Sequence, residues 1–252
     1  MTKHSTVPNT CAIEKMNRML QVLFKAIAGH ASKNRLYISI AVALLLVAVN
    51  PRLCVLAQRP FGGNLYKSLF HDVPVSEIKT ANWPEDLKRR LDEYKNRSLG
   101  FHSQLDDCRA LPDDEVPLCE VTRKVEKGIV SLINSRDIEK EATDYARSAT
   151  LAYEWEGFAD GPLDEARYAE DYLGRNPSSV IKPYLILFLA HRYRCAYECL
   201  EFEQKFDEQK AISEKYQQYL RMAREYPDRL VKLIAEDLDA EPYLYLETKN
   251  HQ

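Results

Sequence analysis

The sequence predicts an all-α fold, and three observations support this prediction. Apolar residues recur at spacings of three and four along much of the chain, as they do on one face of an α-helix. Glycine is scarce, at 8 of 252 residues, which disfavours the tight hairpin turns of β-sheets. Helix-start signals recur as well, most clearly at Pro84-Glu85-Asp86, where acidic residues follow a proline. We therefore expect a helical-hairpin array or an irregular helical bundle over residues 84–247.

A hydrophobic segment precedes this helical domain. Residues 1–35 are polar and basic, and an uncharged apolar run follows at 36–49. As a helix that run is roughly 21 Å long, which is short against a bilayer core of about 30 Å. The stretch that ends at Ala57 has the small-residue pattern of a signal-peptide cleavage site. Residues 36–57 are therefore interpreted as a cleaved signal peptide or as a retained membrane anchor, with a buried helix of a cytosolic protein as the remaining alternative.

The first two interpretations predict the same topology. Positively charged flanks stay on the cytoplasmic side of a membrane, so residues 1–35 form a basic cytoplasmic segment or signal-peptide n-region. The domain that follows is then extracytoplasmic, either periplasmic or secreted. If the hydrophobic segment is retained, the protein is a single-pass protein of the cell membrane with its N-terminus in the cytoplasm.

The remainder of the chain is expected to consist of short connections between helices. Residues 58–83 carry prolines and glycines without a sustained period, which predicts a linker or partly ordered arm. A first helix is expected to end at Gly100, with a polar loop over 101–116. A later helix is expected at about 137–156. The most apolar helix, 184–202, carries apolar residues on nearly every side, which is typical of a helix in the centre of a core.

One stretch combines small residues, a Tyr-Leu pair and a proline-containing turn, at Ala166, Ala169-Glu170-Asp171-Tyr172-Leu173, Asn176-Pro177-Ser178-Ser179, Pro183-Tyr184 and Leu187-Phe188-Leu189-Ala190. Through these residues, 163–200 resembles the tetratricopeptide-type helical hairpins of bacterial envelope proteins. A fainter echo ends at Pro227, which lies 50 residues after Pro177, whereas these repeats usually span about 34. No repeat is found upstream of residue 160. The resemblance implies a TPR-like pairing of helices and a partner-binding role, and it implies no substrate.

Two pairs of cysteines suggest chemistry that depends on their surroundings. Cys108 and Cys119 have ten residues between them, and in an oxidising compartment they could form a disulfide worth about 2–3 kcal/mol; the alternative is two buried free thiols. Cys195 and Cys199 share a helix face with His191, which could suit zinc. Buried cysteines more often pack as small apolar side chains, and no fourth ligand is near. We predict no metal and no cofactor.

Charged and aromatic residues alternate over His191–Arg194, close to Glu201 and Glu203. This cluster is interpreted as a buried ion-pair network that fixes the register of helices. The alternative is a groove that binds an acidic peptide.

Further aromatic residues lie just before the turn at 160–162, where they are either a hydrophobic seal between helices or anchors for a partner. The candidate interaction surface combines them with residues of the central helix, namely Trp155, Phe158, Tyr184, His191 and Arg194.

The functional prediction is a non-catalytic adaptor that binds another envelope protein, with a membrane contact through 36–57 if that segment is retained. A net charge of −3 is too small to favour nucleic acid, and no phosphate-binding loop, nucleophile elbow or metalloprotease motif is found. No catalytic residue is predicted. One alternative is a helical enzyme with a cavity near His191, where nearby Glu or Cys residues would act with the imidazole. Another is a passive, membrane-tethered structural domain.

Overall fold

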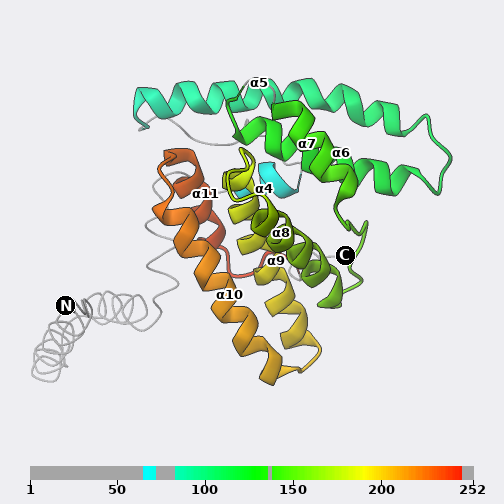
Figure 1. Cartoon of the computed structure of the whole chain (residues 1–252), viewed down its shortest axis with the longest axis vertical. Coiled ribbons are helices and arrows are strands. Elements are labelled where there is room, and N and C mark those ends of the chain that lie inside the picture. The colour runs from blue at the N-terminus through cyan, green and yellow to red at the C-terminus, as the bar shows by residue number, and fades with distance from the viewer. Residues whose placement is uncertain (1–64, 72–82, 136–137, 246–252) are drawn as a thin grey trace, which may run out of the picture. The chain divides into compact units, whose positions relative to one another are not determined.

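The fold is helical throughout the part of the chain that the computed structural model describes, which comprises residues 65–71, 83–135 and 138–245 (Figure 1). The chain divides into two units at Gln58, and only the second contains described residues. None of the described helices is both long and apolar enough to cross a membrane. The predicted signal or anchor at 36–57 lies outside the described residues.

In chain order, the helices of the described residues are α4 (Leu65–Phe70), α5 (Glu85–Cys108), α6 (Val116–Leu132), α7 (Ile138–Ser148), α8 (Asp160–Arg175), α9 (Lys182–Phe202), α10 (Phe206–Glu225) and α11 (Arg229–Ala240). At the start of α11, the Asp228 carboxylate caps the helix by accepting a hydrogen bond from the backbone N–H of Leu230 at 2.8 Å.

Helix α9 is the centre of the fold. It packs along α8 on one side and α10 on the other, and it also contacts α11 and α6. Apolar side chains on nearly every face suit this position, and most of the helix is buried. The prediction of a central core helix is confirmed, and Figure 1 shows α5 and α6 running across the group formed by α8, α9, α10 and α11.

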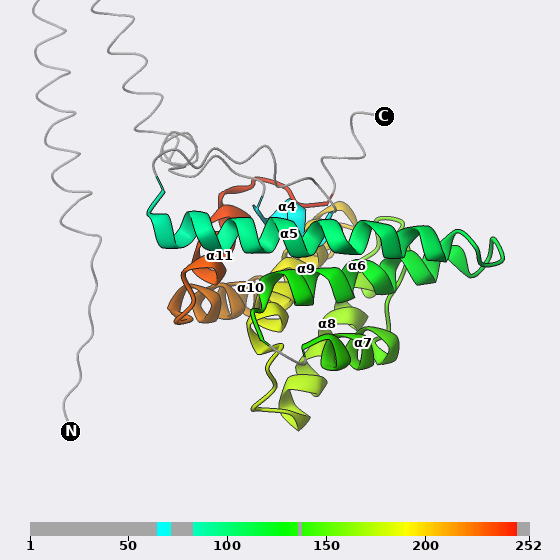
Figure 2. The ribbon, with the colours of Figure 1, turned by 90° about the horizontal axis from the view of Figure 1, so that it is seen from above.

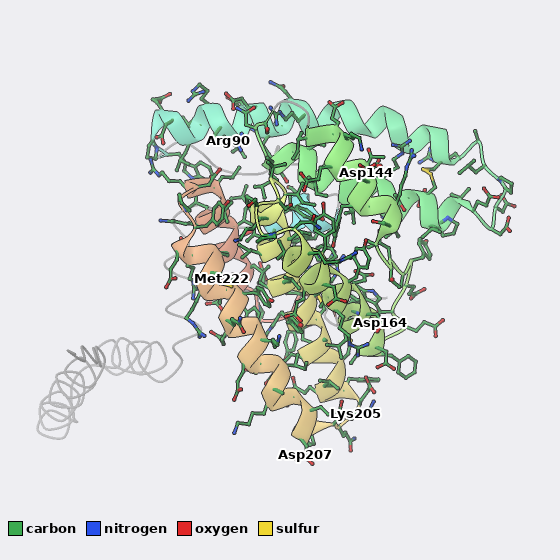
Figure 3. All side chains as sticks on the ribbon, viewed as in Figure 1. Arg90, Asp144, Asp164, Lys205, Asp207 and Met222 are labelled. Atoms are coloured by element: carbon green, nitrogen blue, oxygen red, sulfur yellow. A yellow bond between two sulfur atoms is a disulfide. The ribbon has the colours of Figure 1, made fainter. Side chains whose placement is uncertain are left out.

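Helices α5 and α6 form an antiparallel hairpin that is seen edge-on in Figure 2. A disulfide between Cys108 and Cys119, with Cα atoms 5.6 Å apart, joins the two helices beside their connection (Figure 3). At the other end of the hairpin, the Arg90 and Arg97 guanidinium groups donate hydrogen bonds to backbone carbonyls around Leu132. These carbonyls end α6 and lack partners within the helix, so the arginines cap it.

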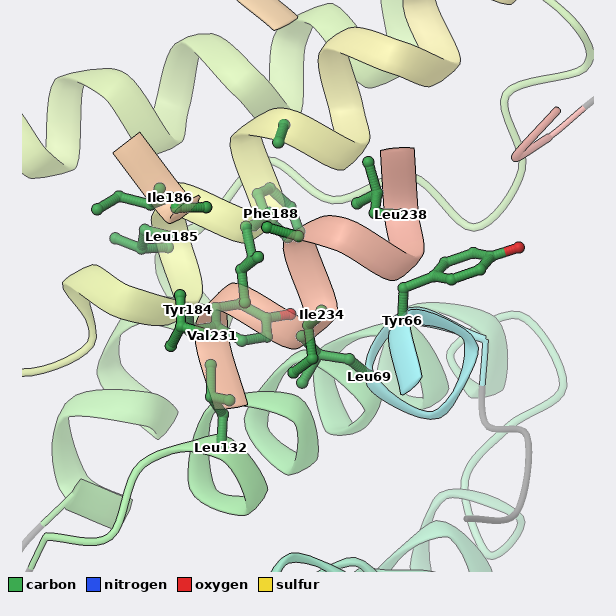
Figure 4. Close-up of a cluster of buried hydrophobic side chains, with 14 of the residues drawn as sticks. Tyr66, Leu69, Leu132, Tyr184, Leu185, Ile186, Phe188, Val231, Ile234 and Leu238 are labelled. Atoms are coloured by element: carbon green, nitrogen blue, oxygen red, sulfur yellow. The ribbon is translucent and has the colours of Figure 1, made fainter. Parts of the chain in front are cut away.

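A single main hydrophobic cluster joins the helices. Figure 4 shows Tyr66 and Leu69 of α4 together with Leu132 of α6, Phe188 of α9 and Ile234 of α11, among other members of the cluster. The backbone N–H of Tyr66 also donates to the Asp237 carboxylate at 3.2 Å. Helix α4 is therefore part of the core, although it lies far from its partners in sequence.

The structure differs from the sequence prediction in three places. Residues 58–83, expected to be a linker or arm, contain the buried helix α4, which is too short to show a helical period. Helix α5 continues through Gly100 to Cys108, since a single glycine costs a helix only about 1 kcal/mol. Helix α7 ends at Ser148, well before residue 156, and the segment that follows packs as irregular chain against α8 and α9.

Candidate functional site

The central helix buries a pair of polar residues that an apolar core would not contain. Within α9, His191 is 1% exposed and Arg192 is 8% exposed. A buried guanidinium is costly unless it is paired and hydrogen-bonded, so the surrounding chain has to supply partners. Those partners come from α8, α4 and the segment between α7 and α8.

Glu165 of α8 supplies the main partner. One of its carboxylate oxygens lies 2.6 Å from Nε of Arg192, and Glu165 is itself 2% exposed. The other oxygen accepts hydrogen bonds from the backbone N–H of Ala152 and from Nε1 of Trp155, each at 3.1 Å. One carboxylate thus fixes Arg192 and the irregular segment before α8.

Aromatic rings enclose the guanidinium group of Arg192. The Cζ atom lies 4.1 Å from the ring centroid of Phe188 and 4.9 Å from that of Trp155. Such contacts favour a cation over the faces of rings and exclude water from the ion pair. Trp155 itself fits closely on α8, because a Cβ atom at Gly161 would lie 2.4 Å from its Cδ1 atom.

His191 connects the buried arginine to the mouth of the site. Its Nδ1 lies 2.9 Å from Nη1 of Arg192, and its Nε2 lies 3.0 Å from Nε2 of His71, an exposed residue just after α4. Because a guanidinium can only donate, Nδ1 of His191 accepts, and the proton of its neutral ring is assigned to Nε2. Nε2 then donates to His71.

The His191 imidazole is held in its neutral form. Burial lowers the pKa of His191 well below its ordinary value, and the positive charge of Arg192 and the neighbouring His71 lower it further. Burial also raises the pKa of the Cys195 thiol, whose Sγ lies 3.5 Å from Nδ1 of His191. Cys195 is therefore a thiol rather than a thiolate, which makes it a poor nucleophile and a poor metal ligand.

A cavity of about 220 Å³ lies beside these groups. Its walls come from the end of α4, one face of α6, the segment before α8, α8, α9 and the C-terminal stretch. The lining residues are Leu69, Phe70, His71, Val121, Lys124, Val125, Ala152, Tyr153, Glu154, Trp155, Glu165, Tyr184, His191, Arg192 and Tyr245. The cavity therefore reaches His191, as the enzyme alternative required.

The predicted interaction residues do not share one surface. Tyr184 and His191 are each 1% exposed, so they belong to the core and the cavity wall, and placing them on a surface was wrong. Trp155 is half-buried over Arg192, and Phe158 is 56% exposed. Arg194 is partly buried and makes contacts of its own. Large aromatic side chains are often buried in a core. The order of residue types along the chain does not show whether a particular ring is buried or exposed.

The arginines of the cluster at 191–194 do form ion pairs, but their partners are not Glu201 and Glu203, the acids that the sequence suggested. Arg192 pairs with Glu165, and Arg194 pairs with Glu198 at 3.2 Å. Glu203 instead accepts from the backbone N–H of Ala159 at 2.8 Å. Helical geometry explains the difference, because Glu198 is one turn from Arg194 whereas Glu201 is seven residues away.

The cysteines of the central helix are both buried and free, and Cys195 contacts His191. Within residues 65–71, 83–135 and 138–245, no group of three or more His, Cys, Asp or Glu residues could hold a metal ion.

Sequence analysis missed Glu165, Lys124 and His71 as parts of this site. Glu165 did carry a signal, because it lies on the same face of α8 as the buried Ala166 and Ala169. An acid on an apolar face predicts a buried partner of opposite charge. His71 carried no comparable signal, since the helix that positions it is too short to show a period.

No protein-family model, curated protein or solved structure matches this chain.

The neutral state of His191 predicts a specific loss of stability in mild acid. In the unfolded chain a histidine has a pKa of about 6.5, so below that pH the unfolded state binds a proton that the folded state does not. We expect this group to lower the free energy of unfolding by up to about 1.4 kcal/mol for each pH unit below about 6.5. Urea unfolding between neutral pH and mildly acidic pH measures it.

His191→Asn tests the assignment, because its amide oxygen can replace Nδ1 as acceptor without titrating. The variant should lose this part of the pH dependence, whereas His251→Asn removes a histidine elsewhere and should keep it. Equal pH dependence in wild type and His191→Asn would contradict the neutral buried histidine.

Proposed function

We propose that this protein binds a small organic molecule in the cavity beside His191. The observation that supports the proposal is a cavity that borders a fixed Arg192–Glu165 pair and a neutral imidazole, and whose other walls are mostly apolar and aromatic, with His71, Lys124 and Glu154 as further polar lining residues. Ligand sites in proteins combine these features, a mostly apolar wall with a few fixed polar groups. At about 220 Å³ the cavity is smaller than the sites that hold drug-sized ligands.

The arrangement supports binding more strongly than catalysis. Glu165 already accepts from Arg192, Trp155 and the backbone of Ala152, so it offers no free base. Cys195 is protonated because burial raises its pKa, and it is a poor nucleophile. Both ring nitrogens of His191 are also occupied, by Arg192 and His71, so it offers no free base either.

A second candidate function is the protein-interaction adaptor expected from the TPR-like resemblance. It is supported by three exposed phenylalanines, Phe158, Phe202 and Phe206, which are 56%, 73% and 62% exposed. The first precedes α8 and the others flank the α9–α10 turn, marked in Figure 3 by Lys205 and Asp207.

The hydrogen bond from the backbone N–H of Ala159 to Glu203 brings these two parts of the chain together, so the three rings belong to one end of the fold. Exposed acids including Asp160, Asp207 and Glu208 surround them. The partner that suits this end is an apolar, basic segment of another envelope protein. A TPR-like pairing of α8, α9 and α10 is the architectural part of the same proposal.

We also propose that the helical domain lies outside the cytoplasm, behind residues 36–57 as signal or anchor. The support is the pairing of Cys108 with Cys119, since structural disulfides persist in oxidising compartments and are rare in the cytosol. The central thiols Cys195 and Cys199 are compatible with that location because both are buried.

Filling the cavity tests the proposed ligand site. Val121 lines the cavity, and Leu118 lies outside it on the same helix and is 56% exposed. Val121→Trp should abolish binding of indole and phenylacetate in ligand-observed NMR, whereas Leu118→Trp should leave it unchanged. Absence of binding by the wild-type protein, or equal binding by both variants, would contradict the site.

A photoreactive amino acid at position 202 tests the adaptor candidate. Placed at that exposed position, it should give one discrete adduct in envelope fractions, and the adduct should disappear with Phe206→Ser. The same amino acid at Lys140, whose side chain is 84% exposed on α7, should give none. Identical adducts from both positions, or no adduct at 202, would count against a partner at this end.

Thiol counting on protein isolated from cells tests the proposed location. Cys108 and Cys119 should resist alkylation in the unfolded protein until a reductant is added, whereas Cys195 and Cys199 should react on unfolding alone. An intact mass that begins at Gln58 would identify cleavage, and retention of 36–57 in a membrane fraction would identify an anchor. Immediate alkylation of all four thiols would argue against an extracytoplasmic domain.

A further inference from the structure

We propose that the ligand of this cavity is a small carboxylate with an apolar body, an inference that rests on the proposed ligand site and specifies its substrate class. The reason is an excess of hydrogen-bond donors on the cavity wall. Three groups that line the cavity have donors without a hydrogen-bond partner in the described structure: Nη2 of Arg192, the hydroxyl of Tyr184 and Nζ of Lys124.

Two of these donors belong to side chains that are more than nine-tenths buried. Arg192 is 8% exposed, and its Nε and Nη1 atoms are occupied by Glu165 and His191, which leaves Nη2 on the cavity side. Tyr184 is 1% exposed, and burial raises the pKa of its hydroxyl above the ordinary value, so it remains a proton donor at neutral pH. Neither donor atom is among the fully buried side-chain atoms that lack a partner in the described residues, so both remain accessible to a ligand in the cavity that their side chains line.

Helix α6 places the third donor on the same side of the cavity. Tyr184 packs against Gly128, where an added Cβ atom would lie 3.2 Å from the tyrosine hydroxyl. Lys124 is four residues before Gly128, so both lie on the same helical face. Lys124 makes no ion pair with any described residue, and it is a partly buried residue that lines the cavity.

The charged groups beside the two buried donors favour a ligand with one negative charge. The Arg192–Glu165 pair is neutral as a unit, and the neutral His191 adds no charge. Lys124 contributes a positive charge beside the two buried donors, and the remaining charged lining residue, Glu154, is exposed at the rim. A carboxylate supplies one negative charge and several acceptor positions, which suits these donors better than an amide or an amine.

The rest of the wall determines the body of the ligand. Phe70, Trp155 and Val125 line the cavity with apolar surface. Aromatic or aliphatic groups of modest size fit such a wall, and the cavity of about 220 Å³ leaves no room for a large molecule. A second strongly charged group on the ligand would be buried without a partner, which is costly.

Matched ligands that differ only in their polar group test this inference. We would measure the Kd of phenylacetate, phenylacetamide and phenethylamine on the protein isolated from cells, by calorimetry. Phenylacetate should bind at least about tenfold more tightly than phenylacetamide, because charge-assisted hydrogen bonds exceed neutral ones. Phenethylamine should bind more weakly than phenylacetate and phenylacetamide, because its ammonium group offers no acceptor to the three donors.

Single-residue variants distinguish the contribution of each donor to ligand affinity from general effects on folding. Lys124→Met should raise the Kd of phenylacetate by about three- to tenfold and leave that of phenylacetamide unchanged. Tyr184→Phe keeps the ring in the core and should weaken both ligands. Lys140→Met removes an exposed lysine of α7 and should change neither.

The outcomes distinguish this inference from the proposed site. Equal affinity for phenylacetate and phenylacetamide, or tighter binding of phenethylamine, would overturn the carboxylate class and leave the ligand site intact. Binding of phenylacetate that Lys124→Met, Tyr184→Phe and Val121→Trp all leave unchanged would overturn it as well, by placing the ligand elsewhere. If no matched ligand binds the folded protein, both the site and the ligand class are contradicted.

Discussion

The buried pair of Arg192 and Glu165 is the interaction on which the arrangement around the cavity depends. It joins the central helix to α8, and its second carboxylate oxygen fixes the irregular segment that carries Trp155. Replacing one member alone would leave a charge in the core without its partner, which costs about 3–5 kcal/mol. The pair also orients His191, because Nη1 of the arginine determines which imidazole nitrogen accepts.

A pair of this kind is expensive to bury, and apolar residues of similar size often stabilise a core at least as well. Its presence in the most buried helix is therefore better explained by what it positions than by the stability it adds. It leaves one edge of a guanidinium facing a cavity, beside rings that exclude water. The exposed phenylalanines of the adaptor candidate form a surface separate from the ligand site. They lie before α8 and at the α9–α10 turn, and none of them lines the cavity.

Sequence reasoning predicted the helical class and the central position of α9, because apolar spacing over many residues reports burial directly. It did not predict α4, a helix of six residues whose formation depends on contacts with α6 and α11. Of the cavity lining, Trp155, Tyr184 and His191 were named from the sequence as an interaction surface, and Arg192 as part of the charged cluster. Its other members come from α4, α6 and α8, and a linear pattern cannot show which distant acid a buried arginine will meet.

The position of α4 couples binding of a ligand in the cavity to the docking of this helix on the core. Phe70 and His71 are wall residues of the cavity, yet they belong to a short helix held by the core through few side chains such as Tyr66 and Leu69. A molecule bound in the cavity would contact this wall only while α4 is docked. By thermodynamic linkage, filling the cavity would therefore favour the docked position of α4, and docking of α4 would raise the affinity of the cavity for its ligand by the same factor.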